Sequence, residues 1–461
     1  MTGLLRLWQR ECIDSALIHY ETERHFLCHA TPGAGKTRMA AVLSEALLAS
    51  NKIDLIFCFA PSLQVVEGMR ATFSSVLGGR LDGLIGALGA AFSYQAMEYR
   101  SEAFWRLLDD YRVFVVFDEI HHCAGSDFLF SNAWGQQILK RLQDQAAYTL
   151  ALSGTPWRSD DRPIALARYT SPEGRLVTDY KYGLREAVRD GVCRSPRIVL
   201  LDNQQVGVAE KARGERTFKL YPSIAQLLLE SSVTYQHLLQ HEEVIMQMLR
   251  LGCEKLTDLS RTTPNAAGLV VATDIDHANQ IVLLLETMGE SCYVVTTEAT
   301  DAQQKINCFK AGGPRWIVAV GMISEGTDIP RLQVCCYLSR IRTELYFRQV
   351  LGRILRRIGE ADGEAWFFSP AETTLKKLAE RIAEDLPEDN AVLRKVELLD
   401  ADATFEEVGL KTGGFDEIEV GIEPNPNESL GGDTPFHNPV SGRVYEISFS
   451  AHYRQELLSC F

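Results

Sequence analysis

The sequence predicts an α/β protein with two doubly wound parallel-sheet lobes, a helical insert between them and an acidic C-terminal tail. Two stretches carry this prediction: ATPGAGKT at residues 30–37 follows an apolar run, and VFVVFDEIHH at residues 113–122 is an apolar run that contains two carboxylates near its end. In addition, strand-like and helix-like segments alternate in two separate parts of the chain. Buried parallel strands read as apolar runs and present ligand-binding residues at their carboxyl ends, so both stretches suit one edge of a sheet.

The length and composition fit two or three globular domains. The chain has 461 residues, of which 46% are hydrophobic, and it contains no run of about eighteen apolar residues. Because the N-terminus has no signal-peptide pattern, we expect a cytoplasmic protein with no membrane segment. The eleven cysteines include no CxxC pair, which predicts buried reduced thiols rather than zinc fingers or disulfides. A net charge of −14 disfavours binding of nucleic acid through bulk electrostatics, although arginine is concentrated between residues 340 and 357.

The first lobe is predicted over residues 1–192. An amphipathic helix near residues 4–12 comes first, and the phosphate loop lies between an apolar strand at residues 26–28 and a helix-like segment after Thr37. Each later strand of this lobe is followed by a polar or glycine-containing turn. Those strands are expected at residues 53–60, at residues 113–118 and from Thr149 onward.

The rest of the chain divides where the sequence pattern changes. Residues 193–262 are predicted to form a linker and a helical insert, because the pattern from Tyr221 to Arg261 is helical over a long stretch. Strand and helix alternation resumes over residues 263–386, which predicts a second lobe without a phosphate loop of its own. Residues 387–461 are predicted to be an acidic flexible linker and a C-terminal docking element that begins as a strand and ends as a helix.

The stretch ATPGAGKT has the composition of a phosphate-binding loop. Gly33 and Gly35 permit a tight turn in which backbone N–H groups face anionic oxygens, and the N-terminus of the following helix supplies positive potential. Lys36 adds a full charge, and Thr37 adds a hydroxyl that can bind a metal ion. An ordinary glycine turn is the alternative, and the carboxylates downstream argue against it. The residues predicted to bind ATP here are Pro32, Gly33, Ala34, Gly35, Lys36, Thr37 and Arg38.

Two carboxylates and one amide extend this predicted site. Asp118 is expected to hold Mg²⁺ together with Thr37, and Glu119 is expected to polarise the attacking water. An acidic loop that only caps a core strand is the alternative interpretation. Gln9 offers the donor and the acceptor that N6 and N7 of adenine require, although a glutamine near an N-terminus is often only solvated.

The ordered set of motifs resembles the superfamily 2 helicases and translocases, specifically the DExH group that includes restriction-enzyme motor subunits and DNA-repair helicases. The resemblance covers residues 1–385 and implies two tandem RecA-like lobes that close on ATP and Mg²⁺. The blocks that resemble motifs I, Ia, Ic, II, III, IV, V and VI are ATPGAGKT, APSLQVVEG, SYQAM, DEIH, SGTP, GLVVATDIDHA, GMISEGTDIP and QVLGRILRR.

The resemblance implies roles for individual residues. Lys36 would contact the β and γ phosphates, Glu119 would act as the catalytic base, and Gln349 would order the attacking water. Arg353 and Arg356 would reach across the cleft as arginine fingers, which ties hydrolysis to closure of the lobes. Residues that would couple closure to the nucleic-acid strand are Ser153, Thr155 and His121, and those near the ribose are Gly326 and Asp328.

For nucleic acid, the resemblance implies a path across both lobes, on the side opposite the ATP. Hydroxyl and N–H groups would contact the strand backbone there rather than the bases. Arg70 has an equally good alternative as a solvated helix arginine. We do not interpret His121 and His122 as a metal site, since neighbours on one strand point to opposite faces. The implied contacts are Ser62, Arg70, Tyr94, Gln95, Thr273 and Ser339.

These patterns predict an ATP-driven helicase or translocase, with DNA favoured over RNA, serving restriction, repair or phage defence. The tail lacks a nuclease pattern, so any cleavage would come from an effector or nuclease protein bound through the tail. Two alternatives remain open. One is an RNA helicase, because contacts to the backbone barely separate the two sugars. The other is an ATP-switched assembly factor that recruits a partner and unwinds nothing.

Overall fold

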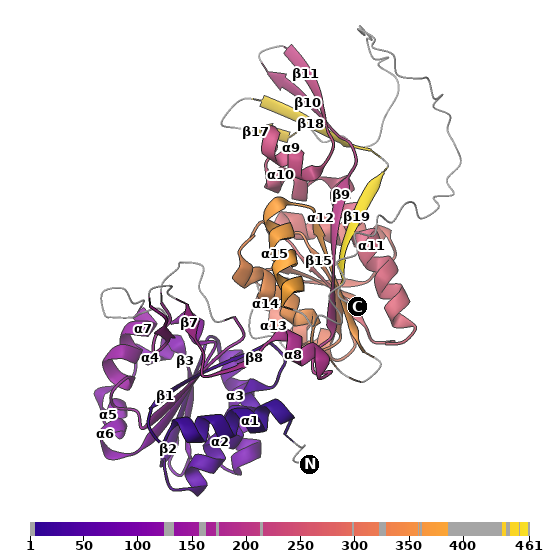
Figure 1. Cartoon of the computed structure of the whole chain (residues 1–461). Helices are drawn as coiled ribbons and strands as arrows, with labels where there is room; N and C mark the ends of the chain where they lie inside the picture. Colours follow the sequence, from indigo (N-terminus) through magenta and orange to yellow (C-terminus); the bar gives the residue numbers. More distant parts are fainter. Residues whose placement is uncertain are drawn as a thin grey trace.

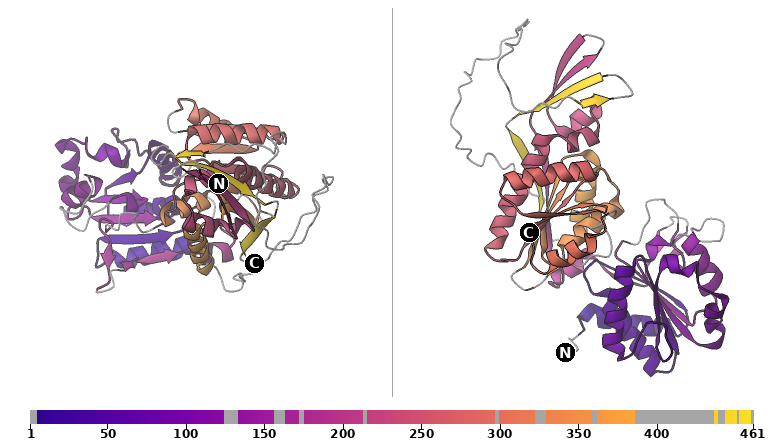
Figure 2. Two further views of the ribbon diagram at one scale, coloured as in Figure 1. Left: turned by 90° about the horizontal axis from the view of Figure 1, so that it is seen from above. Right: turned by 180° about the vertical axis from the view of Figure 1, so that it is seen from behind.

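The computed structural model describes residues 5–123, 133–155, 163–171, 175–212, 215–296, 299–321, 329–357, 359, 362–385, 436–438, 443–450 and 452–459. Two α/β lobes lie side by side, and a small antiparallel sheet projects from the second lobe on the side away from the first (Figures 1 and 2). Within the described residues, every helix is too short or too polar to cross a membrane.

The first lobe is built on a six-stranded sheet in which all neighbouring strands are parallel. Both faces are apolar: Phe114 and Val116 pack toward one core, and Val115 and Phe117 pack toward the other. This alternation explains the continuous apolar runs of the sequence. In spatial order the strands are β3 (Gly89–Ser93), β2 (Leu55–Ala60), β4 (Val113–Asp118), β5 (Tyr148–Ser153), β1 (His25–Ala30) and β8 (Tyr180–Tyr182).

Helices cover both faces of this sheet (Figure 1). One face carries the longer helices α1 (Leu7–His19), α2 (Lys36–Ala49) and α3 (Leu63–Leu77). The other face carries the short helices α4 (Tyr94–Met97), α5 (Glu102–Trp105), α6 (Leu107–Asp110) and α7 (Ala133–Gln137). The remaining elements of this lobe are η1 (Ile120–His122), η2 (Ile138–Leu142), β6 (Arg168–Tyr169), β7 (Leu176–Val177) and α8 (Leu184–Arg189).

The second lobe contains a seven-stranded sheet that is parallel except at one edge. Its strands, in spatial order, are β13 (Cys292–Thr296), β14 (Trp316–Val320), β12 (Ala267–Val271), β15 (Leu332–Tyr337), β16 (Glu364–Pro370), β9 (Ser195–Asn203) and the antiparallel β19 (Tyr453–Ser459). Its helices are α11 (Glu242–Ser260), α12 (Ile275–Thr287), α13 (Ala302–Lys310), α14 (Glu344–Ile354) and α15 (Thr373–Glu384). The predicted fold class, with two tandem parallel-sheet lobes, is confirmed.

The predicted boundary at residue 262 is wrong, because it cuts through the second lobe. Strand β9 belongs to the seven-stranded sheet, and α11 covers a face of that sheet, where Gly252 lies against Trp316 and Cys336. The sequence between these two elements is also only partly helical. It forms the hairpin β10 (Val206–Ala212) and β11 (Glu215–Tyr221), then the short helices α9 (Ile224–Glu230) and α10 (Tyr235–Leu239).

The C-terminal segment is docked onto the chain itself. Strand β18 (Arg443–Phe449) lies between β10 and β17 (Phe436–Asn438) in the small antiparallel sheet, and β19 pairs with β9. Figure 1 shows these yellow strands beside elements from the middle of the chain. The predicted terminal helix is therefore wrong, and the strands predicted to dock a partner fill two edges of this chain's own sheets. Residues 387–435 of the predicted acidic linker lie outside the described residues.

Candidate active site

A cavity of about 520 Å³ lies between the two lobes and is lined by both of them. The first lobe contributes the loop after β1, the end of β4 and the turn after β5. The second lobe contributes α14 and the residues after it. The predicted site residues in the lining are Pro32, Gly33, Gly35, Lys36, Thr37, Asp118, Glu119, Thr155, Gln349, Arg353 and Arg356. Motifs far apart in the sequence thus meet at one place.

The glycine-rich loop turns sharply from β1 into α2. Gly33 and Gly35 have φ of +81° and +93°, a left-handed conformation that only glycine adopts readily. A Cβ on Gly33 would also lie 3.1 Å from Cγ of Arg356 in the other lobe. Helix α2 begins at Lys36 directly after this turn, so the amide groups of its first turn face the cavity as an anion-binding end.

Lys36 is buried and already engaged with the site. Its Nζ donates to the carbonyl of Ala30 at 3.0 Å and lies 3.5 Å from Oε1 of Glu119. The ammonium therefore sits between the phosphate loop and the carboxylates. Thr37, the next residue, lines the same cavity.

Asp118, the last residue of β4, and Glu119, which follows it, lie in different electrostatic environments. Burial and, to a smaller extent, the charge of Glu119 raise the pKa of Asp118 to about 6. Burial also acts to raise the pKa of Glu119, but Lys36, His121 and the backbone N–H of Gly154 outweigh it and lower that pKa to about 2. Glu119 has φ of +52°, which is strained for a residue with a side chain and is common at functional sites.

The oxygen atoms of this site fit a hard divalent cation. Oδ1 of Asp118 is buried and has no hydrogen-bond partner within the described part of the chain, so a positive charge there would offset its desolvation. The hydroxyl of Thr37 is a second oxygen ligand on the same cavity. Mg²⁺ prefers carboxylate, hydroxyl and water oxygens, so the predicted pair of residues suits it.

The turn after β5 connects the carboxylates to the phosphate loop. The N–H of Gly154 donates to Oε2 of Glu119 at 3.2 Å, and a Cβ on Gly154 would lie 3.2 Å from Nζ of Lys36. Ser153 is fully buried, and its Oγ accepts from the N–H of Thr155 at 3.2 Å and lies 3.0 Å from Nδ1 of His121. The three predicted coupling residues therefore form one connected group.

His121 and His122 do not lie on a strand as expected. They belong to the 3-10 helix η1, where their rings lie 4.6 Å apart, so the argument that they point to opposite faces is wrong. Within the described residues, no group of three or more His, Cys, Asp or Glu side chains is arranged to hold a metal ion.

Gln9 is not a solvated N-terminal residue. It is 2% exposed, its Oε1 accepts from the N–H of Arg6 at 2.9 Å, and its Nε2 donates to the carbonyl of Gly35 at 2.9 Å. Trp8 beside it stacks on Tyr182 with ring centroids 4.8 Å apart, which fixes α1 against β8. The side-chain amide of Gln9 thus holds the phosphate loop directly, and its predicted contact with adenine stays a prediction.

Other residues of the cavity were missed by the sequence motifs. Arg6 lines it, and its Nη1 donates to the carbonyl of Ala34 at 2.6 Å. Gln9, Ala34 and Arg38, which were predicted to bind ATP, stand outside the lining, and Gly326 and Asp328 lie outside the described residues. These missed residues are Arg6, Met69, Thr72, Val192 and Lys310. Only the positive charges of Arg6 and Lys310 could have indicated two of them.

The second lobe touches the phosphate loop across the cleft. A Cβ on Gly352 in α14 would lie 3.0 Å from Cβ of Pro32, and Sγ of Cys193 lies 3.6 Å from the carbonyl oxygen of Pro32. Cys193 also forms an isolated backbone bridge with Arg356. The arginines of α14 and its following residues are therefore already at the cavity.

The residues predicted to contact nucleic acid differ in their burial and in their hydrogen bonds. The ring of Tyr94 is fully buried, stacks on Trp134 and donates its hydroxyl to the carbonyl of Asp118 at 2.7 Å, so a side-chain contact to nucleic acid is wrong. Arg70 is not simply solvated, since its Nη2 donates to the carbonyl of Ala91 at 2.6 Å. The other candidates stay predictions: Ser62 caps α3, Gln95 is exposed, Thr273 is half-buried, and Ser339 is 3% exposed.

Comparison with known proteins identifies this arrangement. Residues 3–158 match the family described as type III restriction enzyme, res subunit. An uncharacterised protein of Mycobacterium tuberculosis is 32% identical over 401 residues, which cover 81% of this chain and 62% of that protein. A DNA 3′-5′ translocase of Sulfurisphaera tokodaii is 23% identical over 382 residues, covering 77% of this chain and 79% of the translocase. These matches confirm the predicted resemblance to superfamily 2 helicases and translocases.

The structural comparison agrees for the fold. The chain aligns with a fragment described as an HsdR subunit of a type I restriction enzyme from Vibrio vulnificus, with a TM-score of 0.58 and 17% identity. The alignment covers 84% of this chain and 68% of the fragment. This likeness supports the predicted fold. The chain spans about 62% of the length of its mycobacterial relative.

Proposed function

We propose that this superfamily 2 chain hydrolyses ATP in the cavity between its lobes and uses lobe closure to move along DNA, as a translocase or helicase. One observation carries the proposal. The phosphate loop and both carboxylates form one wall of the cavity, while Arg353 and Arg356 belong to the opposite lobe. An active site divided in this way is complete only when the lobes meet, so turnover and movement are linked.

The charges of the cavity suit a triphosphate. The basic residues of the lining outnumber its two carboxylates, Asp118 and Glu119. The first turn of α2 adds backbone N–H groups and the positive end of a helix. Mg²⁺ held by Thr37 and Asp118 would neutralise phosphate oxygens. The basic residues are Arg6, Lys36, Lys310, Arg353, Arg356 and Arg357.

Each protein residue has a distinct task in this proposal. Lys36 binds the β and γ phosphates, while Glu119 and Gln349 orient the attacking water. Arg353 and Arg356 stabilise the charge on the transferring phosphoryl group, a contribution of ~10³- to 10⁵-fold in kcat for arginines of this kind. Gln9 and Arg6 hold the phosphate loop through its carbonyls, and Gln9 is the proposed contact to the adenine base.

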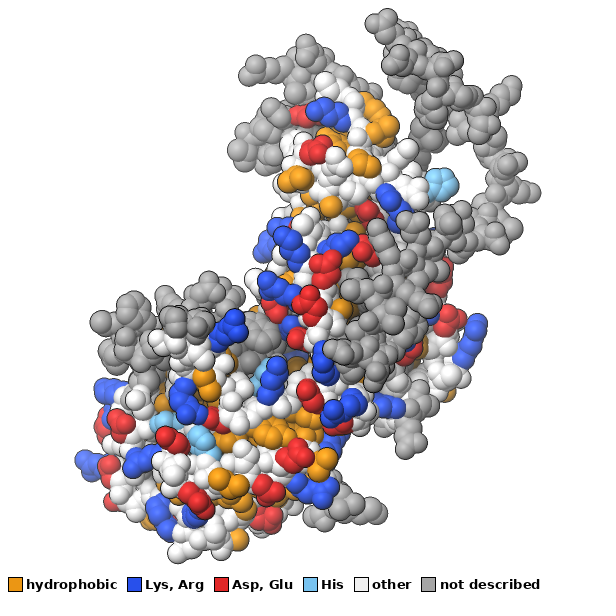
Figure 3. Space-filling model, in the orientation of Figure 1, with side chains coloured by type: hydrophobic (Ala, Val, Ile, Leu, Met, Phe, Trp, Pro, Cys, Tyr) orange, Lys and Arg blue, Asp and Glu red, His pale blue; other side chains and the backbone are white. Residues whose placement is uncertain are grey.

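DNA is the proposed partner because the archaeal relative is named a DNA translocase. Basic and acidic side chains are interspersed on the described surface seen in Figure 3, so local contacts rather than bulk charge would hold the strand. We retain Ser62, Gln95, Thr273 and Ser339 as candidates for these contacts. The similarity to restriction subunits supports a role in restriction or defence.

The test is ATP turnover by the purified chain with no nucleic acid, single-stranded DNA, duplex DNA and single-stranded RNA, at one salt concentration. We expect DNA to stimulate turnover and Lys36→Ala to abolish it. Stimulation by RNA alone would replace DNA with RNA as the partner. No turnover with any of these polymers would refute the proposal, and displacement of a labelled strand would separate unwinding from translocation.

A further inference from the structure

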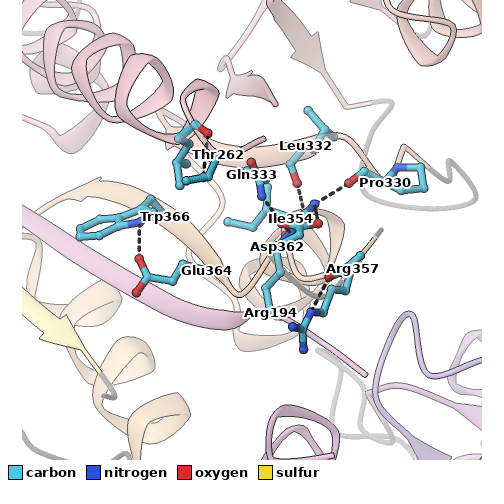
Figure 4. A network of polar contacts seen from close by, with 12 residues as sticks. Arg194, Thr262, Pro330, Leu332, Gln333, Ile354, Arg357, Asp362, Glu364 and Trp366 are labelled. Carbon is cyan, nitrogen blue, oxygen red and sulfur yellow. Dashed lines mark hydrogen bonds and ion pairs between the residues drawn. The ribbon is translucent and has the colours of Figure 1, made fainter. Parts of the chain in front are cut away.

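We propose that Arg194, in the segment that crosses from the first lobe to the second, is a positioning residue for Arg353 and Arg356. The inference rests on the proposed function of the cavity and adds a residue that no motif of the sequence contains. Arg194 precedes β9 directly and is fully buried. Figure 4 shows its guanidinium at the centre of a group of acceptors from the second lobe.

All five N–H groups of this guanidinium are used. Nε and Nη2 donate to the two carboxylate oxygens of Asp362, each at 2.5 Å. Nη1 donates to the carbonyls of Leu332 at 2.5 Å and Ile354 at 2.6 Å, and Nη2 donates to that of Pro330 at 2.8 Å. Since arginine has five N–H donors in a rigid planar fork, these bonds fix the relative positions of all the acceptors.

The acceptors belong to the parts of the second lobe that form the cavity. Ile354 ends α14 and follows Arg353 directly, while Pro330 lines the cavity itself. The backbone N–H of Arg194 also donates to the carbonyl of Leu355 at 2.8 Å, one residue before Arg356. A single side chain thus joins the end of α14 to the end of motif V at Pro330 and the start of β15 at Leu332.

The crossing segment is bound to the same strip of chain along its length. Nη1 of Arg357 donates to the carbonyl of Gly191 at 3.0 Å, and Cys193 forms a backbone bridge with Arg356. When the lobes move, this strip must therefore follow the crossing segment. Arg194 therefore transmits the position of this crossing segment to Arg353 and Arg356.

A buried ion pair is a costly way to fill a core, because two charges lose their hydration. An apolar pair of similar shape would pack as well, but it would not hold three carbonyls at defined directions. Asp362 is itself oriented by the side-chain amide of Gln333, which donates to its Oδ1. The ion pair of Arg194 and Asp362 therefore fixes the positions of the three carbonyl groups bound to Arg194.

Arg197, three residues further on in β9, provides a matched control. It is 8% exposed and donates to Oε1 of Glu364 at 2.8 Å, so it too is a buried arginine bound to a carboxylate across β9 and β16. Glu364 also accepts from the indole of Trp366 (Figure 4). Neither Arg197 nor Glu364 lines the cavity.

The experiment compares the wild-type chain with Arg194→Lys, Arg197→Lys and the double variant Arg194→Met with Asp362→Leu. A lysine keeps the charge but has three donors at one point, so it cannot reach all the acceptors. We expect Arg194→Lys to lower kcat for DNA-stimulated ATP turnover by ~10- to 100-fold, with KM for ATP within about 3-fold of wild type. Arg197→Lys should keep wild-type kcat.

The double variant separates positioning from stability. It removes both buried charges, so its melting temperature should match or exceed that of Arg194→Lys. If Arg194 acts only in folding, kcat should recover together with stability, and that result would overturn the proposal. Persistently low kcat in a stable double variant supports it.

Amide hydrogen exchange tests the contact without any turnover. Residues 353–357 should exchange faster in Arg194→Lys than in wild type, and at the wild-type rate in Arg197→Lys. Equal exchange in all three chains would also overturn the proposal. If the wild-type chain itself shows no turnover, the proposed function fails, and the exchange result still decides the role of Arg194.

Discussion

Replacing Gly33 by alanine should slow ATP hydrolysis through the opposite lobe, and Gly78 offers a matched control. Both glycines are left-handed, with φ of +81° and +65°. Each alanine variant therefore meets a backbone penalty of about 1–2 kcal/mol. The surroundings differ, since a Cβ on Gly78 would enter open space, whereas one on Gly33 would lie 3.1 Å from Cγ of Arg356.

The size of the effect follows from this contact. Carbon atoms pack best at ~3.5–4.0 Å, so Arg356 must retreat by about 0.5 Å. A misplacement of about 1 Å in an active site can cost ~10²-fold in rate, so we expect a loss of ~10-fold in kcat. Both variants should lose about 2–4 °C in melting temperature per kcal/mol of backbone penalty.

The assay is steady-state ATP turnover with DNA, together with thermal unfolding of both variants. The expected pattern is equal losses of stability with a loss of kcat confined to Gly33→Ala. A rise in KM alone would mean that the new methyl group blocks the phosphates and does not displace Arg356. Equal kcat in the two variants would refute the contact as a determinant of catalysis.

Three further predictions concern the arginines, Asp118 and the C-terminal strands. Replacing Arg353 and Arg356 together by alanine should lower kcat by ~10³-fold or more and leave ATP binding nearly intact, and unchanged turnover would contradict the proposed function. Because the pKa of Asp118 is raised from 3.8 to about 6, its stabilising contribution is complete below pH 3.8 and is lost as the pH rises through about 6. Asp118→Asn should therefore increase the free energy of unfolding by up to ~3 kcal/mol at pH 8 without Mg²⁺, and by nearly nothing at pH 3.5, in denaturant titrations. Ending the chain after residue 442 removes β18 and β19, including the buried side chain of Ile447. Burial of that side chain alone contributes about 2 kcal/mol to the free energy of unfolding, so the melting temperature should fall. An unchanged melting temperature would restore the interpretation of the tail as a separate docking element.

Sequence patterns revealed the residues whose geometry is set by the chain near them. Gly33 and Gly35 must supply positive φ in a strand-to-helix turn, and Asp118 must appear where a buried strand meets the sheet edge. These requirements are local, so they leave a recognisable spacing. The parallel sheets were predictable for the same reason, because apolar runs and helical segments alternate along the chain.

The errors arose where distant parts of the chain decide the outcome. Tyr94 has a polar edge and lies in a motif that implied nucleic acid, but stacking on Trp134 and a bond to the carbonyl of Asp118 bury it. Tyr453 and Leu457 are spaced as on a helix face, but the open edge of β9 draws this segment into a strand. Arg194 had no signal at all, since its bonds go to four residues distributed over the second lobe.

The charges of the cavity also suggest why nucleotide must arrive before the chemistry can start. Glu119 has a pKa of about 2 because Lys36, His121 and the N–H of Gly154 outweigh its burial, and so weak a base takes a proton from water poorly. In the proposed function, phosphates bound to Lys36 would share the ammonium charge that now acts on Glu119. With that charge shared, the burial that already acts on Glu119 raises its pKa and makes it a better base. In the proposed function, binding of ATP would thus prepare the carboxylate on one wall of the cavity, and closure of Arg353 and Arg356 would prepare the other.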